Sequence, residues 1–209
     1  THQSIERTRC QDCCTYGKGC RFRINIEIYI MKSNCYFAWD KELSHEICQR
    51  LINLGQGNWN SAAVVNKSVV GARKSDIVWT KEQWVYDLIS PYMFSANEQA
   101  GWKYNITAAQ DCQVTRYTKD GFYNWHIDGM GSHTELDGDG NTRKLSMSVI
   151  LNSDYKGGDF EMRDLENQVP RLEEGSIIVF PSFVEHRVTP VTEGIRYSLV
   201  TWFVGPPYV

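Results

Sequence analysis

The sequence predicts a mainly β domain, a sandwich or barrel, with flanking helices of the α+β class. Beyond residue 101 the chain consists of short strand-like runs separated by turn residues, whereas the stretch from 40 to 99 has helical periodicity. There are no internal repeats or linkers, and 209 residues are enough to bury one full core. The strand-like runs are WKYNI, CQVTRY, FYNWHI, KLSMSVIL, GGDFEM, SIIVF, HRVTPV and IRYSLVTWFV.

Two helices are expected ahead of these strands. The first spans 40–54, because its apolar residues recur at helical spacing and Gly55 provides a stop. The second is expected to begin at Thr80, where Gln83 completes a capping box. Pro91 is expected to break or restart this helix, since proline is tolerated in a first turn but not in an interior. Both helices most simply support the outside of a sheet.

Residues 1–30 differ from the rest of the chain and are interpreted as an N-terminal extension. They are polar and cysteine-rich, and Met31 opens the part, residues 31–209, that is expected to form the main domain. Over 24–30 isoleucines alternate with polar residues, as in a half-buried strand. This segment is therefore a candidate edge strand.

Composition and charge favour an ordinary cytoplasmic protein. The net charge of −3 and the pI near 6.0 give no reason to expect a nucleic-acid partner. No run of about eighteen apolar residues is present, so no membrane span is expected, and the N-terminus lacks the apolar core of a secretory signal. The seven cysteines are an odd count, and the cluster at 10–20 matches no standard zinc finger. Free thiols in a reducing compartment are expected.

Three potential metal ligands follow from the strand pattern. His126 and Asp128 lie in the run YNWHIDG, and alternation along an extended strand makes an imidazole and a carboxylate face the same way. His186, in a second strand-like stretch after SIIVFP, can supply the third ligand. Two histidines and one carboxylate leave the remaining coordination positions open, which is the arrangement of non-heme Fe(II) oxygenases.

Arg196 adds an anion receptor to this predicted site. A hairpin loop at 192–194, ending in glycine, would place His186 and Arg196 on the same side of a strand pair, about 13 Å apart along the strand. A guanidinium pairs bidentately with a carboxylate and stays charged at any working pH. It therefore suits a small dicarboxylate whose other end chelates the metal. Ser198, two residues on and on the same face, can add a hydroxyl donor.

These motifs together resemble the Fe(II)- and 2-oxoglutarate-dependent dioxygenases, most closely the prolyl 4-hydroxylase-like group. The resemblance covers residues 35–205, and its specificity comes from the order of the H-x-D pair, the distal histidine and the R-x-S pair. Its matching segments are QVTRYTKDGFYNWHID, KLSMSVILNSDYKGGDFE and EEGSIIVFPSFVEHRVTPVTEGIRYSLVTWF. It implies His126, Asp128 and His186 as iron ligands, and Arg196, Ser198 and Tyr117 as partners of the distal 2-oxoglutarate carboxylate.

The resemblance also implies a fold and a reaction. The fold is a double-stranded β-helix, the cupin-like jelly roll, and the reaction is hydroxylation of an unactivated C–H bond with succinate and CO2 as coproducts. Fe(II), 2-oxoglutarate and ascorbate are the implied cofactors, and a peptidyl proline in a peptide or protein is the implied substrate. Tyr123 and Trp202 are candidate substrate contacts. Regular alternation turns Tyr123 away from the metal face, and core packing is an equal reading for Trp202.

Other functions fit parts of the pattern. A hydroxylase of a free amino acid or other small molecule would carry every motif equally well, and many prolyl 4-hydroxylases have lysine at the position of Arg196. A nucleic-acid demethylase would be expected to have a second arginine where this chain has Trp202. A zinc hydrolase could use the same three ligands but would not need Arg196. A non-catalytic jelly-roll binding module would not need all four groups.

Overall fold

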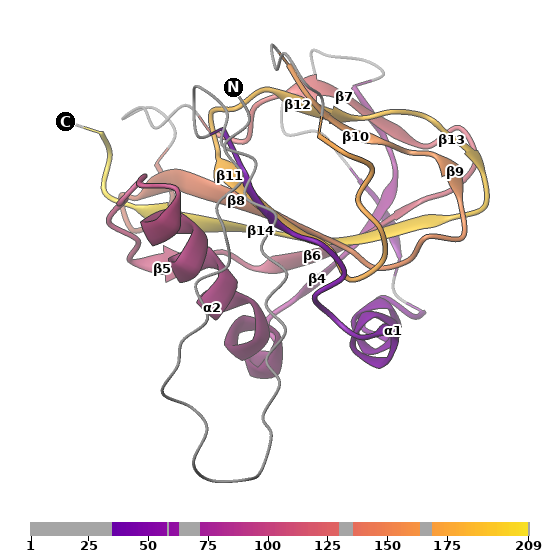
Figure 1. Ribbon diagram of the computed structural model, residues 1–209, viewed down its shortest axis with the longest axis horizontal. Helices are drawn as coiled ribbons and strands as arrows, with labels where there is room; N and C mark the ends of the chain where they lie inside the picture. The colour runs from indigo at the N-terminus through magenta and orange to yellow at the C-terminus, as the bar shows by residue number, and fades with distance from the viewer. Residues whose placement is uncertain (1–34, 58, 63–71, 130–135, 164–168, 209) are drawn as a thin grey trace, which may run out of the picture.

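The computed structural model describes residues 35–57, 59–62, 72–129, 136–163 and 169–208. It is a sandwich of antiparallel sheets with two helices outside the larger sheet (Figure 1). The predicted mainly β class with flanking helices is therefore confirmed. The cysteine cluster, the N-terminal extension and its candidate edge strand lie outside the described residues. Neither described helix is long and apolar enough to cross a membrane.

The larger sheet has eight strands and the smaller has four. Their orders are β1-β11-β8-β14-β6-β4-β2, with β5 beside β14, and β10-β12-β7-β3. A two-stranded pair, β13-β9, lies at one end of the sandwich (Figure 1). The elements in chain order are β1 (Phe37–Trp39), α1 (His45–Asn53), β2 (Asn60–Ser61), β3 (Arg73–Lys74), β4 (Asp76–Thr80), α2 (Gln83–Gln99), β5 (Ala108–Ala109), β6 (Cys112–Tyr117), β7 (Phe122–His126), β8 (Thr142–Ile150), β9 (Lys156–Gly157), β10 (Phe160–Met162), β11 (Ile177–Pro181), β12 (His186–Val188), β13 (Val191–Glu193) and β14 (Arg196–Gly205).

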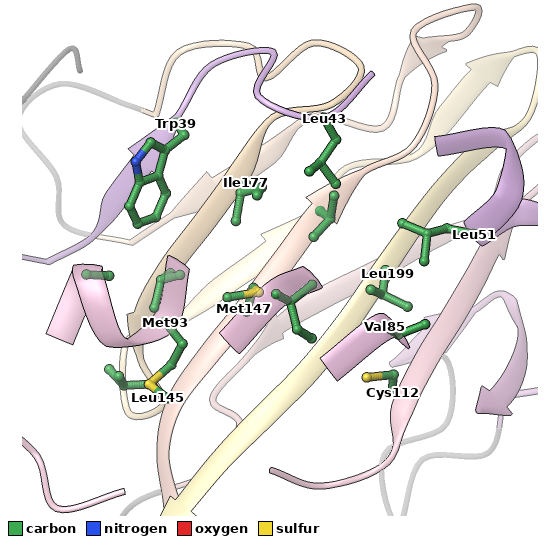
Figure 2. Packing of buried hydrophobic residues seen from close by; sticks show 14 of the residues in the cluster. Trp39, Leu43, Leu51, Val85, Met93, Cys112, Leu145, Met147, Ile177 and Leu199 are labelled. Atoms are coloured by element: carbon green, nitrogen blue, oxygen red, sulfur yellow. The ribbon is translucent and has the colours of Figure 1, made fainter. Parts of the chain in front are cut away.

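Alternation along the central strands separates the core from the space between the sheets. Leu145 and Met147 of β8 and Leu199 of β14 pack with the helices in the main hydrophobic core. Figure 2 shows these side chains together with residues of both helices. Their neighbours of opposite parity, such as Ser146 and Ser198, face the smaller sheet. One face of the larger sheet is therefore apolar, and the other is available for polar chemistry.

Both helices differ from the sequence expectation at their starts. The first begins at His45 rather than at residue 40, because Ser44 caps it by accepting a hydrogen bond from the Ile47 amide. The second begins at Gln83, because Thr80 is the last residue of β4 and pairs with Cys112 instead of capping a helix. The predicted capping box is therefore wrong.

The expected break at Pro91 is also wrong, since α2 continues through it to Gln99. Pro91 is exposed, as is Asp87 one turn earlier. The Asp87 carbonyl, which loses its helical partner at the proline, can therefore be hydrated, and the cost of the missing bond is reduced.

The predicted hairpin between the distal histidine and Arg196 does not form. β12 pairs with β10 and β7, whereas β14 pairs with β6, β8 and β5. Pro190 has no N–H to donate to a ladder, and the chain leaves the smaller sheet there, passing through β13 before it joins the larger sheet as β14. His186 and Arg196 therefore face each other from opposite sheets, not along one strand pair. WKYNI, also expected as a strand, has no regular structure.

Removing a core side chain of α2 should destabilise the protein. Ile89 is completely buried, so Ile89→Ala is expected to lower the free energy of unfolding by about 2 to 5 kcal/mol. Phe94 lies on the same helix with 58% of its surface exposed, and Phe94→Ala should change it by less than about 1 kcal/mol. Urea unfolding measures both. Equal losses for the two variants would contradict the packing of this helix.

Candidate metal centre

Three side chains that can bind a metal ion converge between the sheets. His126 ends β7, His186 begins β12 directly opposite it, and Asp128 follows two residues after the first histidine. Their ligand atoms all lie within 4.8 Å of one another. The Nε2 atoms of His126 and His186 are 3.7 Å and 3.6 Å from the two carboxylate oxygens of Asp128. The structure thus brings the three sequence-predicted ligands to one point.

Local hydrogen bonds orient both imidazoles. Nδ1 of His126 lies 2.7 Å from the carbonyl oxygen of Asn124, and Nδ1 of His186 lies 2.9 Å from that of Val184. A carbonyl can only accept, so each Nδ1 carries the proton and each Nε2 keeps its lone pair toward Asp128. Hydrogen bonds of this kind fix the tautomer and the ring orientation of metal-binding histidines.

Two serines hold the carboxylate of Asp128. The hydroxyl of Ser146 donates to Oδ2 at 2.7 Å and lies 3.0 Å from the hydroxyl of Ser182. The Ser182 carbonyl accepts hydrogen bonds from the backbone amides of Asp128 and Gly129. Hydrogen bonds to its carboxylate and to its backbone amide therefore hold Asp128 in place, although this residue lies beyond the end of β7.

The charges of the cluster suit a metal cation. Burial opposes ionisation of Asp128, but His186, His126 and the Ser146 hydroxyl together hold its pKa below the ordinary value. Burial, and then the neighbouring His186, lowers the pKa of His126 to about 4. At neutral pH the site offers an anionic carboxylate and a neutral imidazole at position 126, the forms that bind metal.

A β-bulge brings Tyr123 to the same face as His126. Along β7, Tyr123 is opposite Val188 and His126 is opposite His186, so two intervening residues oppose only one on β12. The Tyr123 ring consequently stacks on the His126 ring, with centroids 3.5 Å apart. Regular alternation would have turned it away. Trp125 lies on the other side of the sheet, against Arg187.

Arg196 is the largest fully buried side chain of the described residues. Its Nη1 donates to the Ser198 hydroxyl at 3.0 Å, and its guanidinium lies 5.3 Å from the ring of Tyr117, the residue opposite it on β6. Its Nε has no hydrogen-bond partner, and no described carboxylate pairs with it. Gly158 passes so close that a Cβ there would meet the Arg196 Cδ at 2.9 Å. The positive charge is therefore packed tightly but not neutralised.

The metal cluster and Arg196 line the same cavity, whose volume is about 650 Å³. Trp202 also lines it, 7% exposed, with an indole Nε1 that has no hydrogen-bond partner among the described residues. Arg143 stacks on Trp202 at 3.9 Å and donates to Gln110 and to the Asp128 carbonyl. Trp202 thus faces the cavity rather than the core under the helices.

These groups fit a metal ion and a small dianion. Two imidazoles and one carboxylate are the donor set of a mononuclear Fe(II) site with open positions. A buried guanidinium with an unpartnered Nε requires an anion, because an uncompensated charge is costly in a dry interior. The hydroxyl of Ser198, already in contact with Arg196, lies beside the place where a carboxylate would sit.

Residues 112–204, which contain all three clustered ligands and Arg196, match the family model of the 2OG-Fe(II) oxygenase superfamily. This part of the chain is therefore similar to that superfamily. The similarity implies Fe(II) and 2-oxoglutarate as metal and cosubstrate, as the resemblance stated from the sequence also does.

Curated proteins similar to this region are PKHD-type hydroxylases. One from Alteromonas mediterranea is 33% identical over 90 residues, covering 42% of this chain and 40% of that protein. Another, from Synechococcus sp. strain CC9311, is 33% identical over 92 residues, covering 43% of this chain and 39% of that protein. The matched part spans about two fifths of the length of these relatives.

Solved structures share the fold of this protein over about four fifths of the chain. A viral collagen prolyl hydroxylase from Paramecium Bursaria Chlorella virus-1 superposes with a TM-score of 0.63 at 20% identity, covering 81% of this chain and 96% of that one. A Pseudomonas putida prolyl-4-hydroxylase gives 0.61 at 22% identity, with coverage of 80% and 91%. At these identities the likeness establishes the fold, and it confirms the predicted jelly roll.

The cavity and the metal cluster involve residues that sequence reasoning missed. Ser146 could have been found, because serines alternate with apolar residues in KLSMSVIL and must lie on the face opposite the core. Ser182 and Arg143 carry no such signal, since their roles depend on pairing between distant strands. Arg73 was missed because β3 has only two residues, too few for a periodic pattern.

Acid should destabilise the metal-free protein through His126. In the unfolded chain its pKa is about 6.5, so between pH 6.5 and 4 the unfolded state binds a proton that the folded state does not. The free energy of unfolding should consequently fall with decreasing pH over this window, by about 3 kcal/mol from this residue. Urea unfolding at a series of pH values would measure the slope. His126→Gln should flatten it and the exposed-site control His45→Gln should not; an unchanged slope in His126→Gln would contradict the assignment.

Proposed function

We propose that this chain is an Fe(II)- and 2-oxoglutarate-dependent dioxygenase that hydroxylates a peptidyl proline. The observation that carries the proposal is one cavity lined by both a two-histidine, one-carboxylate cluster and a buried, uncompensated guanidinium. A metal site alone would suit a hydrolase, but a hydrolase has no use for the buried charge. A metal-chelating dicarboxylate uses both features at once.

His126, Asp128 and His186 are proposed to hold Fe(II). The Nε2 lone pairs and the Asp128 oxygen supply three positions, and the backbone carbonyls and Ser146 keep those atoms in place without metal. Because the pre-existing hydrogen bonds fix the tautomer and rotamer, little ordering remains to be done when the ion binds. An ion held there would face the cavity, which all three side chains line.

Arg196, Ser198 and Tyr117 are proposed to hold the distal carboxylate of 2-oxoglutarate. The unpartnered Nε of Arg196 and the Ser198 hydroxyl are the donors, and the buried Tyr117 lies directly opposite on β6. Their depth between the sheets excludes water and strengthens the charge pair. When bound, Fe(II) and 2-oxoglutarate supply the oxidising chemistry that couples decarboxylation to hydroxylation, with succinate and CO2 as coproducts. Ascorbate remains a prediction from the family resemblance.

A peptidyl proline is the proposed substrate because prolyl hydroxylases are prominent among the proteins of similar fold. One of these structures is described as a complex with a peptide fragment of hypoxia inducible factor. Tyr123 and Trp202, both lining the cavity, are the proposed aromatic contacts. A free amino acid is the alternative substrate. A turnover assay with both kinds of probe distinguishes the two, because only the true substrate gains an oxygen atom.

Succinate formation with Fe(II), 2-oxoglutarate and a panel of proline-containing peptides tests the function. His186→Ala should abolish turnover, whereas Arg196→Ala should chiefly raise the KM for 2-oxoglutarate, at a cost of about 2 to 5 kcal/mol. Mass spectrometry of the peptide should show a gain of one oxygen atom. Arg116→Ala is the matched control, because Arg116 is on β6 but pairs with Asp76 outside the cavity. Parent-like kinetics in both site variants would reject the assignment.

The hydrogen bond from Ser146 should support metal affinity. Ser146→Ala removes the donor to Asp128 and should weaken Mn(II) binding about tenfold or more, as measured by calorimetry. Ser148→Ala alters the next residue on the same face of β8, which makes no hydrogen bond to the cluster, and should bind Mn(II) like the parent. Equal affinities for the two variants would show that the serine is not needed.

A further inference from the structure

Besides Arg196 and Arg143, a third guanidinium lines the cavity and has no obvious place in the proposed reaction. Arg73 of β3 lines the cavity, and its hydrogen bonds go only to neutral groups: Nε to Ser75 at 2.6 Å, and Nη2 to Gln113 at 2.8 Å and Thr115 at 3.4 Å. Within the described part of the chain no carboxylate pairs with it, and its Nη1 makes no hydrogen bond to another described residue.

The position of Arg73 is fixed in advance. Its guanidinium lies 4.7 Å from the Tyr123 ring, and that ring stacks on the imidazole of His126. The amide oxygen of Gln113 and the hydroxyls of Ser75 and Thr115 hold the two bonded nitrogens. An anion bound to the remaining edge of the guanidinium would therefore lie near Tyr123, in the cavity that the metal cluster also lines, at little further entropic cost.

The charges that line the cavity leave room for one more anion. Among the described residues they are three guanidinium groups, of Arg73, Arg143 and Arg196, and two carboxylates, of Asp128 and Asp137. The two positive charges of a ferrous ion and the two negative charges of 2-oxoglutarate cancel. One positive charge then remains. Arg143 is engaged with Trp202, Gln110 and the backbone of Asp128, whereas Arg73 has only neutral partners.

We propose that Arg73 is a specificity residue that binds a carboxylate of the substrate being hydroxylated. This inference rests on the proposed function, because it takes the cavity to be the substrate site. A single carboxylate matches both the one residual charge and the planar fork of arginine. The carboxylate belongs either to an acidic side chain near the reacting residue of a peptide or to the α-carboxylate of a free amino acid.

Matched probes test the proposal by calorimetry on the full chain with Mn(II) and 2-oxoglutarate, so that turnover is not required. The peptide probes carry glutamate or glutamine at each position flanking a proline, and the free pair is L-proline and L-prolinamide. The parent should bind the carboxylate member of at least one pair about tenfold more tightly. The pair that responds identifies the source of the carboxylate.

Arg73→Gln should remove this preference, and Lys74→Gln, the adjacent exposed residue on β3, should keep it. If Arg73→Gln fails to fold by circular dichroism, Arg73→Lys keeps the charge without the fork and should reduce the preference. Peptides with lysine at the responding position should bind the parent more weakly than those with glutamine.

Three outcomes would overturn the proposal: no pair is discriminated by the parent, the preference survives in Arg73→Gln, or Arg73→Gln acts by weakening 2-oxoglutarate binding. The last would make Arg73 a cosubstrate ligand. Succinate formation tests the proposed function, and binding of the matched probes tests the role of Arg73. A failure of one proposal can therefore be distinguished from a failure of the other.

Discussion

Alternation along the regularly paired parts of β8, β14 and β6 is the constraint on which the rest of the structure depends. Each strand is paired on both edges, so none can slip by one residue without turning every core side chain into the cavity. Leu199 under the helices and Ser198 beside Arg196 are thus fixed by the same register. The apolar core, worth far more than any contact in the site, fixes the position of the polar face.

The metal cluster departs from this regularity where the chemistry requires it. His126 and His186 face each other because β7 and β12 pair, but the bulge between Tyr123 and His126 gives both rings the same direction. Asp128 lies beyond the strand and depends on Ser146 and on the carbonyl of Ser182 for its position. A bulge costs a ladder hydrogen bond and re-aims a side chain, which is why bulges occur next to functional sites.

Sequence alone predicted what depends on local spacing. The H-x-D pair, the shared parity of Arg196, Ser198 and Trp202, and most strands follow from a period of two residues. The cap at Thr80, the break at Pro91 and the hairpin after His186 were wrong, because each local signal lost to pairing or solvation elsewhere in the fold. Contacts between segments far apart in sequence, such as Arg73 with Gln113, have no local signature at all.

The electrostatics of the cavity also distinguish the two arginines as anion sites. Without metal and cosubstrate, Arg196 and Arg73 both lack a carboxylate partner among the described residues, so either attracts an anion. Arg196 is almost completely buried and has lost nearly all of its hydration, whereas Arg73 is only partly buried and keeps some of it. An anionic partner therefore stabilises the Arg196 charge more than the Arg73 charge. The dicarboxylate that also reaches the metal is therefore held more strongly. Once the dicarboxylate has bound, the remaining positive charge is that of Arg73, beside Tyr123. A second carboxylate is therefore attracted to Arg73.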